Sequence, residues 1–215
     1  MEKYLVATEM LDANHPSVVE YVAEFKKVES DKDKAIALYN KVRDGFVYTP
    51  YHLDLRPQGL TASTILQKKK AWCVEKAIVL ATGLRALGIP SRLGYGIVVN
   101  HIGVEKLLHY LRRPEIVFHG FVDVYVEGKW VKATPAFDPL VCRKAGVPIL
   151  DWDGENDAMF QAYLGSQEFM EYKHYYGVFD DVPVQLMNEE MKKYYPHLFE
   201  SVFNTPEFSL LHIWS

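Results

Sequence analysis

The chain contains little cysteine and no long hydrophobic run. Cys73 and Cys142 are its only thiols among 215 residues, so at most one disulfide could form. No apolar stretch approaches the ~20 residues needed to span a bilayer, and residues 1–9 contain acidic side chains and no signal-peptide core. These absences predict a cytoplasmic protein without a membrane partner, in which both thiols are free because the compartment is reducing.

The sequence also lacks an excess of positive charge and metal-binding motifs. Its formal net charge is -4 and its Lys/Arg clusters are short, which argues against a nucleic-acid partner. It has no His-Glu-x-x-His pattern and no closely spaced cysteine pair, so we expect no metal and no other cofactor. Apolar residues at 49% and charged residues at 24% are typical of a globular protein large enough for one substantial core.

Helical periodicity marks several segments of the first half of the chain. Pro16 opens a helix expected to run to about Lys27, and Ser30 with Asp33 forms a capping signature for a second helix that ends at Asp44-Gly45. Residues 47–60 follow neither the helical nor the strand period and predict an irregular connection, followed by a helical turn over 61–66.

A third helix is expected to begin near Cys73 and to stop at Gly88, two residues before Pro90. A thiol in the first turn of a helix feels the positive end of the helix dipole, which lowers its pKa and favours the nucleophilic thiolate. The structural alternative is that Cys73 is simply a small buried hydrophobe, as most unpaired cysteines are. Cys73 becomes a convincing nucleophile only if a base lies elsewhere in the chain.

Strands are predicted after this helix. Residues 92–99 read as one strand, residues 104–113 as a short helix, and residues 116–126 and 129–133 as a hairpin joined by Glu127-Gly128. If the hairpin turn has two residues, extending its ladder brings His119 opposite Ala136, with Thr134 and Asp138 diagonal to it on the same face. Either residue could orient the imidazole, although a lone histidine on a strand is most often structural.

Several of these segments together resemble the transglutaminase-like superfamily of papain-type cysteine enzymes. They are Ala-Trp-Cys at 71–73, Leu-Arg-Ala-Leu-Gly-Ile-Pro-Ser-Arg at 84–92, the strand around His119, and Trp-Val-Lys-Ala-Thr-Pro at 130–135. The resemblance covers about residues 30–138. It implies an α+β fold in which the nucleophile, at a helix N-terminus, packs on an antiparallel sheet, and a catalytic order of Cys, His and an acid.

The sequence departs from the family pattern at three places. Ala71 replaces a usual Gly, Gly120-Phe121 follows His119 where Ala-Trp is usual, and Thr134 occupies the position of the family's Asp. A carboxylate stabilises an imidazolium, whereas a hydroxyl only orients the ring. We therefore prefer Asp138 to Thr134 as the third residue, although a loop-capping role for Asp138 is the alternative.

The functional expectation is cysteine-dependent acyl transfer or hydrolysis at peptide or carboxamide bonds, with Cys73 as nucleophile and His119 as base. The backbone N–H of Cys73 is one expected oxyanion donor, and the second is not identifiable from the sequence. The rival hypothesis is an inactive fold of the same family that binds a peptide or protein. In both cases the partner is a peptide or protein, and the oligomeric state is left open.

The remaining residues, 139–215, are expected to form an extension packed on the same domain as residues 1–138. A helix is predicted over 156–164, closed by Gly165, and the rest is a Tyr-rich tail. Cys142 has no placed base and is expected to be structural.

Overall fold

The fold is built on a four-stranded antiparallel sheet, seen in a computed structural model that describes residues 1–51, 53–101, 105–160 and 170–200. The strand order is β5-β4-β3-β6, so β6, the last strand in the sequence, pairs with β3 at one edge of the sheet. The strands are β3 (Ser91–Asn100), β4 (Glu115–Val126), β5 (Lys129–Ala133) and β6 (Met170–Phe179).

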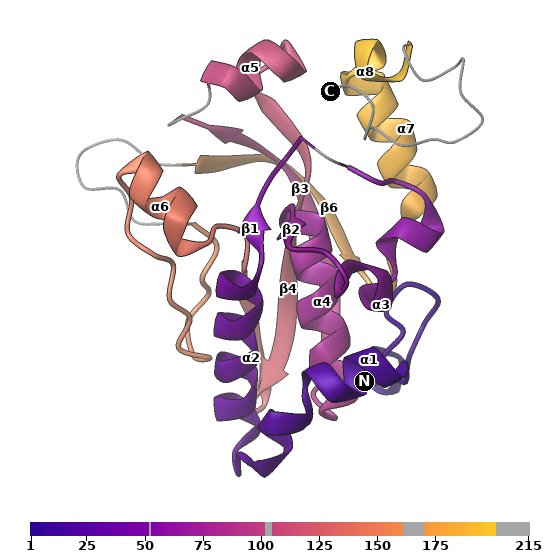
Figure 1. Ribbon diagram of the computed structural model, residues 1–215, viewed down its shortest axis with the longest axis vertical. Helices are drawn as coiled ribbons and strands as arrows, with labels where there is room; N and C mark the ends of the chain where they lie inside the picture. The colour runs from indigo at the N-terminus through magenta and orange to yellow at the C-terminus, as the bar shows by residue number, and fades with distance from the viewer. Residues whose placement is uncertain (52, 102–104, 161–169, 201–215) are drawn as a thin grey trace.

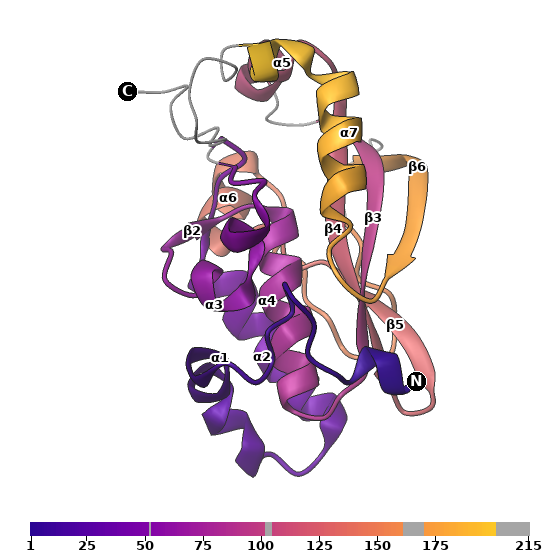
Figure 2. The same cartoon turned by 90° about the vertical axis from the view of Figure 1, so that its right-hand side faces the viewer.

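Helices cover one face of this sheet, as Figure 2 shows for α2, α3 and α4. Helix α7 packs against β4, and α8 lies at the end of the molecule that also carries α5 (Figures 1 and 2). The helices are α1 (Pro16–Tyr21), α2 (Asp31–Gly45), α3 (Ala62–Ile65), α4 (Cys73–Ala86), α5 (Glu105–Leu111), α6 (Pro139–Ala145), α7 (Val184–Tyr194) and α8 (Pro196–Glu200), with 3-10 turns at Glu2–Tyr4, Ala23–Lys27 and Pro57–Leu60. No helix among these described segments is long and apolar enough to cross a bilayer.

Helix α4 is the centre of the fold, because it packs on β3 and β4 and is covered by α1, α2 and α3. Every residue from Cys73 to Arg85 is buried. The approach of α2 depends on Gly83, since a Cβ at this position would lie 2.8 Å from a methyl carbon of Leu38. Helix α2 begins as its sequence predicts, with the Ser30 hydroxyl accepting a hydrogen bond of 3.0 Å from the Asp33 N–H.

The hairpin between β4 and β5 has the predicted two-residue turn. Glu127 and Gly128 both have positive φ, at 50° and 84°, as a turn that matches strand twist requires. Pairing runs from Val126–Lys129 to Val122–Ala133. The expected extension to His119 and Ala136 is not part of this ladder, because the chain leaves the sheet after Ala133.

A second, smaller sheet lies beside the start of α4. It pairs β1 (Val47–Tyr48) in parallel with β2 (Lys70–Ala71), in register Val47–Lys70 and Tyr48–Ala71. The segment predicted to be irregular therefore contains one ordered strand. This pairing brings Tyr48 next to the residues that immediately precede Cys73.

The C-terminal part corrects one sequence prediction and adds a strand that was not predicted. Residues 156–160 are not helical, and Ala158 instead forms a parallel bridge with Ala133 beside β5. Residues 161–164 of the expected helix lie outside the described residues. The Tyr-rich segment contains β6, whose aromatic and β-branched residues favour a strand and which pairs with β3 over Leu93–Phe179 to Asn100–Met170.

Candidate active site

Cys73 is the first residue of α4, and its side chain is only 1% exposed. The helix start is fixed by Glu75, whose carboxylate accepts a hydrogen bond of 3.2 Å from the Trp72 N–H. Lys68 donates to the same carboxylate at 2.5 Å. Of the three consecutive lysines at 68–70, Lys68 thus pairs with Glu75.

The start of α4 lies directly on strand β4 because Gly120 has no side chain. A Cβ at Gly120 would lie 3.1 Å from the Cα of Val74 and 3.4 Å from the carbonyl oxygen of Cys73. The residue that follows His119 in the chain is thus packed directly against the start of α4.

His119 lies in β4 directly opposite Gly96 of β3, and it is 1% exposed. Its ring faces the rings of Tyr172 and Phe160, with centroid distances of 6.3 Å and 6.4 Å. Space for Tyr172 is provided by Gly96, where a Cβ would lie 2.6 Å from that ring. Within the described part of the chain the buried Nε2 of His119 has no hydrogen-bond partner.

Burial sets the protonation states of both groups. It raises the pKa of the Cys73 thiol to about 11, although the N–H groups of Gly120, Val74 and Cys73 itself pull in the opposite direction. It also lowers the pKa of His119 to about 4. The expected lowering of the thiol pKa by the helix start is therefore wrong for this closed site, because desolvation outweighs the helix amides. At neutral pH the site holds a neutral thiol and a neutral imidazole.

Thr134 is buried directly after β5. Its hydroxyl donates to the Met159 sulfur at 3.9 Å, and its N–H donates to the carbonyl of Ala158 at 3.0 Å. Its carbonyl accepts from the Tyr39 hydroxyl at 3.2 Å. These contacts tie Thr134 to the segment that runs beside β5.

Asp138 is also buried, and it caps α6. Its carboxylate accepts from the N–H groups of Leu140 at 2.8 Å and Val141 at 3.2 Å, as in the loop-capping alternative. Its other oxygen accepts from the Tyr48 N–H at 2.7 Å. The Asp138 carboxylate is thereby connected to β1, the strand beside Cys73.

Two residues near the thiol escaped the sequence analysis. Lys76, one turn after Cys73, is 0% exposed and donates to three backbone carbonyls: Arg43 at 2.8 Å, Phe46 at 3.0 Å and Ala136 at 2.8 Å. Tyr48 is the second residue: burial, and next the nearby Cys73 thiol, raise the pKa of its phenol well above the usual value. The signal for Lys76 was a cation directly before the apolar run 77–81 of α4, since a charge cannot be buried there without polar partners.

Two further expectations concern Cys142, the second cysteine, and metal binding. Cys142 is a buried residue of α6, and its thiol donates to the carbonyl of Phe137 at 3.9 Å. Neither Cys142 nor Cys73 forms a disulfide, as expected. The described residues contain no group of three His, Cys, Asp or Glu side chains that could hold a metal ion.

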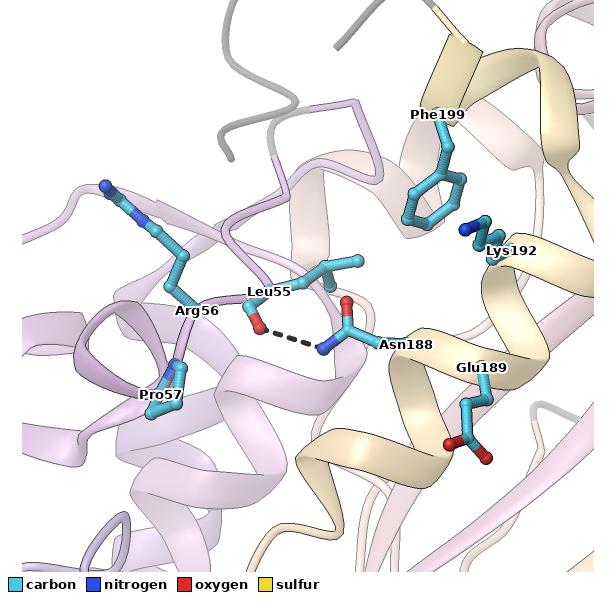
Figure 3. A pocket seen from close by; sticks show the side chains of 7 residues that line it. All are labelled: Leu55, Arg56, Pro57, Asn188, Glu189, Lys192 and Phe199. Atoms are coloured by element: carbon cyan, nitrogen blue, oxygen red, sulfur yellow. Dashed lines mark hydrogen bonds between the residues drawn. The ribbon is translucent and has the colours of Figure 1, made fainter. Parts of the chain in front are cut away.

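A pocket of about 400 Å³ lies apart from Cys73, between α7 and the segment after β1. In Figure 3 the Phe199 ring reaches towards this space, and the Asn188 amide donates to the Leu55 carbonyl at 3.3 Å. The pocket therefore lies where the C-terminal helices contact the segment between β1 and α3. It is lined by Leu55, Arg56, Pro57, Asn188, Glu189, Lys192 and Phe199.

A comparison with protein families matches the part of the chain that contains Cys73 and His119. The model of the transglutaminase-like superfamily matches residues 19–135, which include Cys73, His119 and Thr134 and end before Asp138. No curated protein matches the sequence. A solved structure of a candidate cysteine protease from Cytophaga hutchinsonii aligns at 18% identity with a TM-score of 0.49, covering 66% of this chain and 43% of that one. The present chain thus spans less than half the length of that protein.

Proposed function

Because the chain belongs to the transglutaminase-like superfamily, we propose that it catalyses cysteine-dependent acyl transfer or hydrolysis at peptide or carboxamide bonds. Cys73 is the nucleophile, His119 is the general base, and the substrate is a cytoplasmic peptide or protein. The observation that carries this proposal is the packing of the α4 start on β4, where Gly120, the residue after His119, lies against Val74 and the carbonyl of Cys73.

In the proposed reaction His119 takes the thiol proton while the Cys73 sulfur attacks the carbonyl carbon. The carbonyl oxygen becomes an oxyanion, and the N–H of Cys73 at the helix start can donate to it. His119 then gives the proton to the leaving amine as the carbon–nitrogen bond breaks, which leaves a thioester. Water or a second amine attacks the thioester and regenerates the thiol.

The protonation states constrain when the proton moves. Burial raises the pKa of the Cys73 thiol to about 11 and lowers the pKa of His119 to about 4, so burial favours the neutral pair over a thiolate–imidazolium pair in the closed site. Proton transfer instead accompanies attack on the substrate, or it follows movement of the side chains that cover the thiol.

The third residue remains a prediction, with Asp138 preferred to Thr134. The two candidates are tested by comparing the rates at which p-nitrophenyl acetate acylates Asp138→Ala and Thr134→Ala. A larger rate loss at Thr134 would reverse the preference. The pH at which His119 protonates, followed by NMR, separates an orienter from a residue that acts elsewhere, because loss of a carboxylate partner lowers the histidine pKa.

The second candidate function is peptide or protein binding by an inactive member of the same family. Thr134 at the position of the family's acid favours it, as does the burial of both reacting groups at 1% exposure. Binding of this kind does not depend on the thiol. A Cys73→Ala variant that retains every activity of the parent protein would support the binding function.

The experiment that tests the proposal is acylation of the full chain by p-nitrophenyl acetate, followed by mass spectrometry of the labelled peptide. Cys73→Ala should abolish the acyl-enzyme, and the matched variant Cys142→Ala should retain it because Cys142 lies in α6 without a placed base. Glutamine-containing peptides supplied with a fluorescent amine then separate transamidation from hydrolysis. Acylation that persists in Cys73→Ala would refute the assignment of the nucleophile.

A further inference from the structure

We propose that Tyr195 is a positioning residue for His119, because its hydroxyl holds the β-bulge that sets the place of His119 in β4. The inference rests on the proposed role of His119 as the general base. Tyr195 lies outside the family match, which ends at residue 135, and it directly follows α7, which packs against β4. A residue of the C-terminal part thus acts on the base through the backbone of β4.

Strand β4 contains one extra residue just before His119. In β3, Gly96 pairs with His119. Two residues further along β3, Val98 pairs with Ile116, which precedes His119 by three residues. A regular ladder continued from Val98 and Ile116 would bring His119 opposite Tyr95 instead. Because a slip of one residue turns a side chain to the other face of a sheet, this bulge decides which face carries the imidazole.

The bulge places Phe118, the residue before His119, in a strained backbone conformation. Its φ is 60°, in the left-handed region that is unfavourable for a bulky side chain. Such a conformation persists only where the surroundings fix it. The Phe118 ring is buried and stacks on Tyr176, with centroids 4.7 Å apart and planes at 26°. Packing therefore holds the ring, but backbone groups where the ladder is interrupted need partners of their own.

The Tyr195 hydroxyl provides such partners. It accepts a hydrogen bond of 2.9 Å from the Val117 N–H and donates one of 2.6 Å to the Glu115 carbonyl. Tyr195 is only 1% exposed, and its bond with Val117 is buried. One hydroxyl thus bridges the backbone on both sides of Ile116, the last residue that pairs regularly before the bulge.

Loss of this hydroxyl would release the strained bulge and move the imidazole. It would leave the buried Val117 N–H without its acceptor, which is costly enough to favour a rearrangement of the strand. His119 would then leave its place opposite Gly96, where its ring faces Tyr172 with centroids 6.3 Å apart. A displacement of about 1 Å in a reacting group can cost about a hundredfold in rate.

The test is Tyr195→Phe, which removes the hydroxyl and keeps the buried ring. We expect acetylation of Cys73 by p-nitrophenyl acetate to fall by at least about tenfold, because the base is displaced. Nuclear Overhauser effects between the rings of His119 and Tyr172 should weaken or vanish. The Val117 amide should exchange faster with solvent than it does in the parent protein.

Tyr176→Phe is the matched control. It also removes a phenol hydroxyl from the C-terminal part, from the ring that stacks on Phe118. The Tyr176 hydroxyl donates to Glu190 at 2.7 Å and not to the bulge. This variant should therefore leave the acetylation rate, the ring contacts of His119 and the exchange of the Val117 amide unchanged.

A double-mutant comparison separates positioning of the base from a general loss of stability. If Tyr195 acts through His119, Tyr195→Phe should add less than about twofold to the rate loss already caused by His119→Gln. A hydroxyl with a merely structural role would lower the rate by the same factor in both backgrounds.

Unchanged ring contacts of His119 in Tyr195→Phe, or equal rate losses in both backgrounds, would overturn the inference, as would the same losses in Tyr176→Phe. Fast exchange of the Val117 amide in the parent protein would also overturn it, and this measurement needs no variant to fold. If the parent protein and Cys73→Ala acetylate equally slowly, the proposed function fails instead. The ring contacts and the amide exchange would then still decide whether Tyr195 holds His119.

Discussion

Acid should destabilise this protein through His119 before most carboxylates are protonated. Burial lowers the pKa of His119 from 6.5 to about 4, so the folded protein takes up its proton later than the unfolded chain does. The stability that the neutral imidazole contributes is present above pH 6.5 and is lost as the pH falls towards 4. A shift of about 2.5 units corresponds to about 3 kcal/mol in total, of which about 2.5 kcal/mol should be lost by pH 4.5.

The assay is urea unfolding of the parent protein and of His119→Gln, measured from pH 7.5 to 4.5. Glutamine does not titrate, so the difference between the two free energies of unfolding should shrink or reverse by about 2.5 kcal/mol over this range. His109→Gln, a substitution of an exposed histidine on α5, should follow the parent protein throughout.

Parallel curves for the parent protein and His119→Gln would refute the reasoning. They would mean that His119 protonates in the folded protein near its unfolded pKa, so that water or a carboxylate reaches the ring. An NMR titration of the histidine ring protons gives an independent check, because the His119 signal should stay unshifted until the pH approaches 4.

Two further predictions concern the surroundings of the site. Asp138→Ala removes a helix cap and leaves a backbone N–H of β1 without its acceptor, so it should lower the free energy of unfolding by about 2–4 kcal/mol; Glu9→Ala, at an exposed position, should lower it by less than about 1 kcal/mol in the same urea assay. Gly96→Ala places a Cβ 2.6 Å from the Tyr172 ring and 2.7 Å from a backbone carbonyl of β6, so unfolding should become easier by more than about 2 kcal/mol and amide exchange in β6 should accelerate. Gly45→Ala, whose nearest neighbour would be 3.8 Å away, should leave both unchanged.

The sequence predicts correctly those features that depend on a few adjacent residues. The Ser30 cap, the start of α4 at Cys73 and the two-residue turn at Glu127 each depend on a few adjacent residues, and each was predicted correctly. The predicted α+β fold, with the nucleophile's helix packed on an antiparallel sheet, is also confirmed. The packing of this helix on the sheet was predicted from the family resemblance.

The chemistry of the site depended on contacts that no local pattern records. The thiol pKa rises rather than falls because tertiary packing buries Cys73, and the helix start alone could not reveal that burial. The partners of Lys76 lie between 30 and 60 residues away in the chain. Thr134 shares the predicted hairpin, yet its hydroxyl contacts Met159 in a segment that had been predicted to be helical.

Strand β6 has a consequence for how this protein can be divided. It covers the outer side of β3 along its length, although it lies beyond the family match that ends at residue 135. A chain cut after Asp138 would leave β3 as a bare edge, with a row of open N–H and C=O groups that recruit strands from other molecules. Such a fragment should aggregate during expression, so laboratory studies of Cys73 and His119 require the strand that follows them by more than fifty residues.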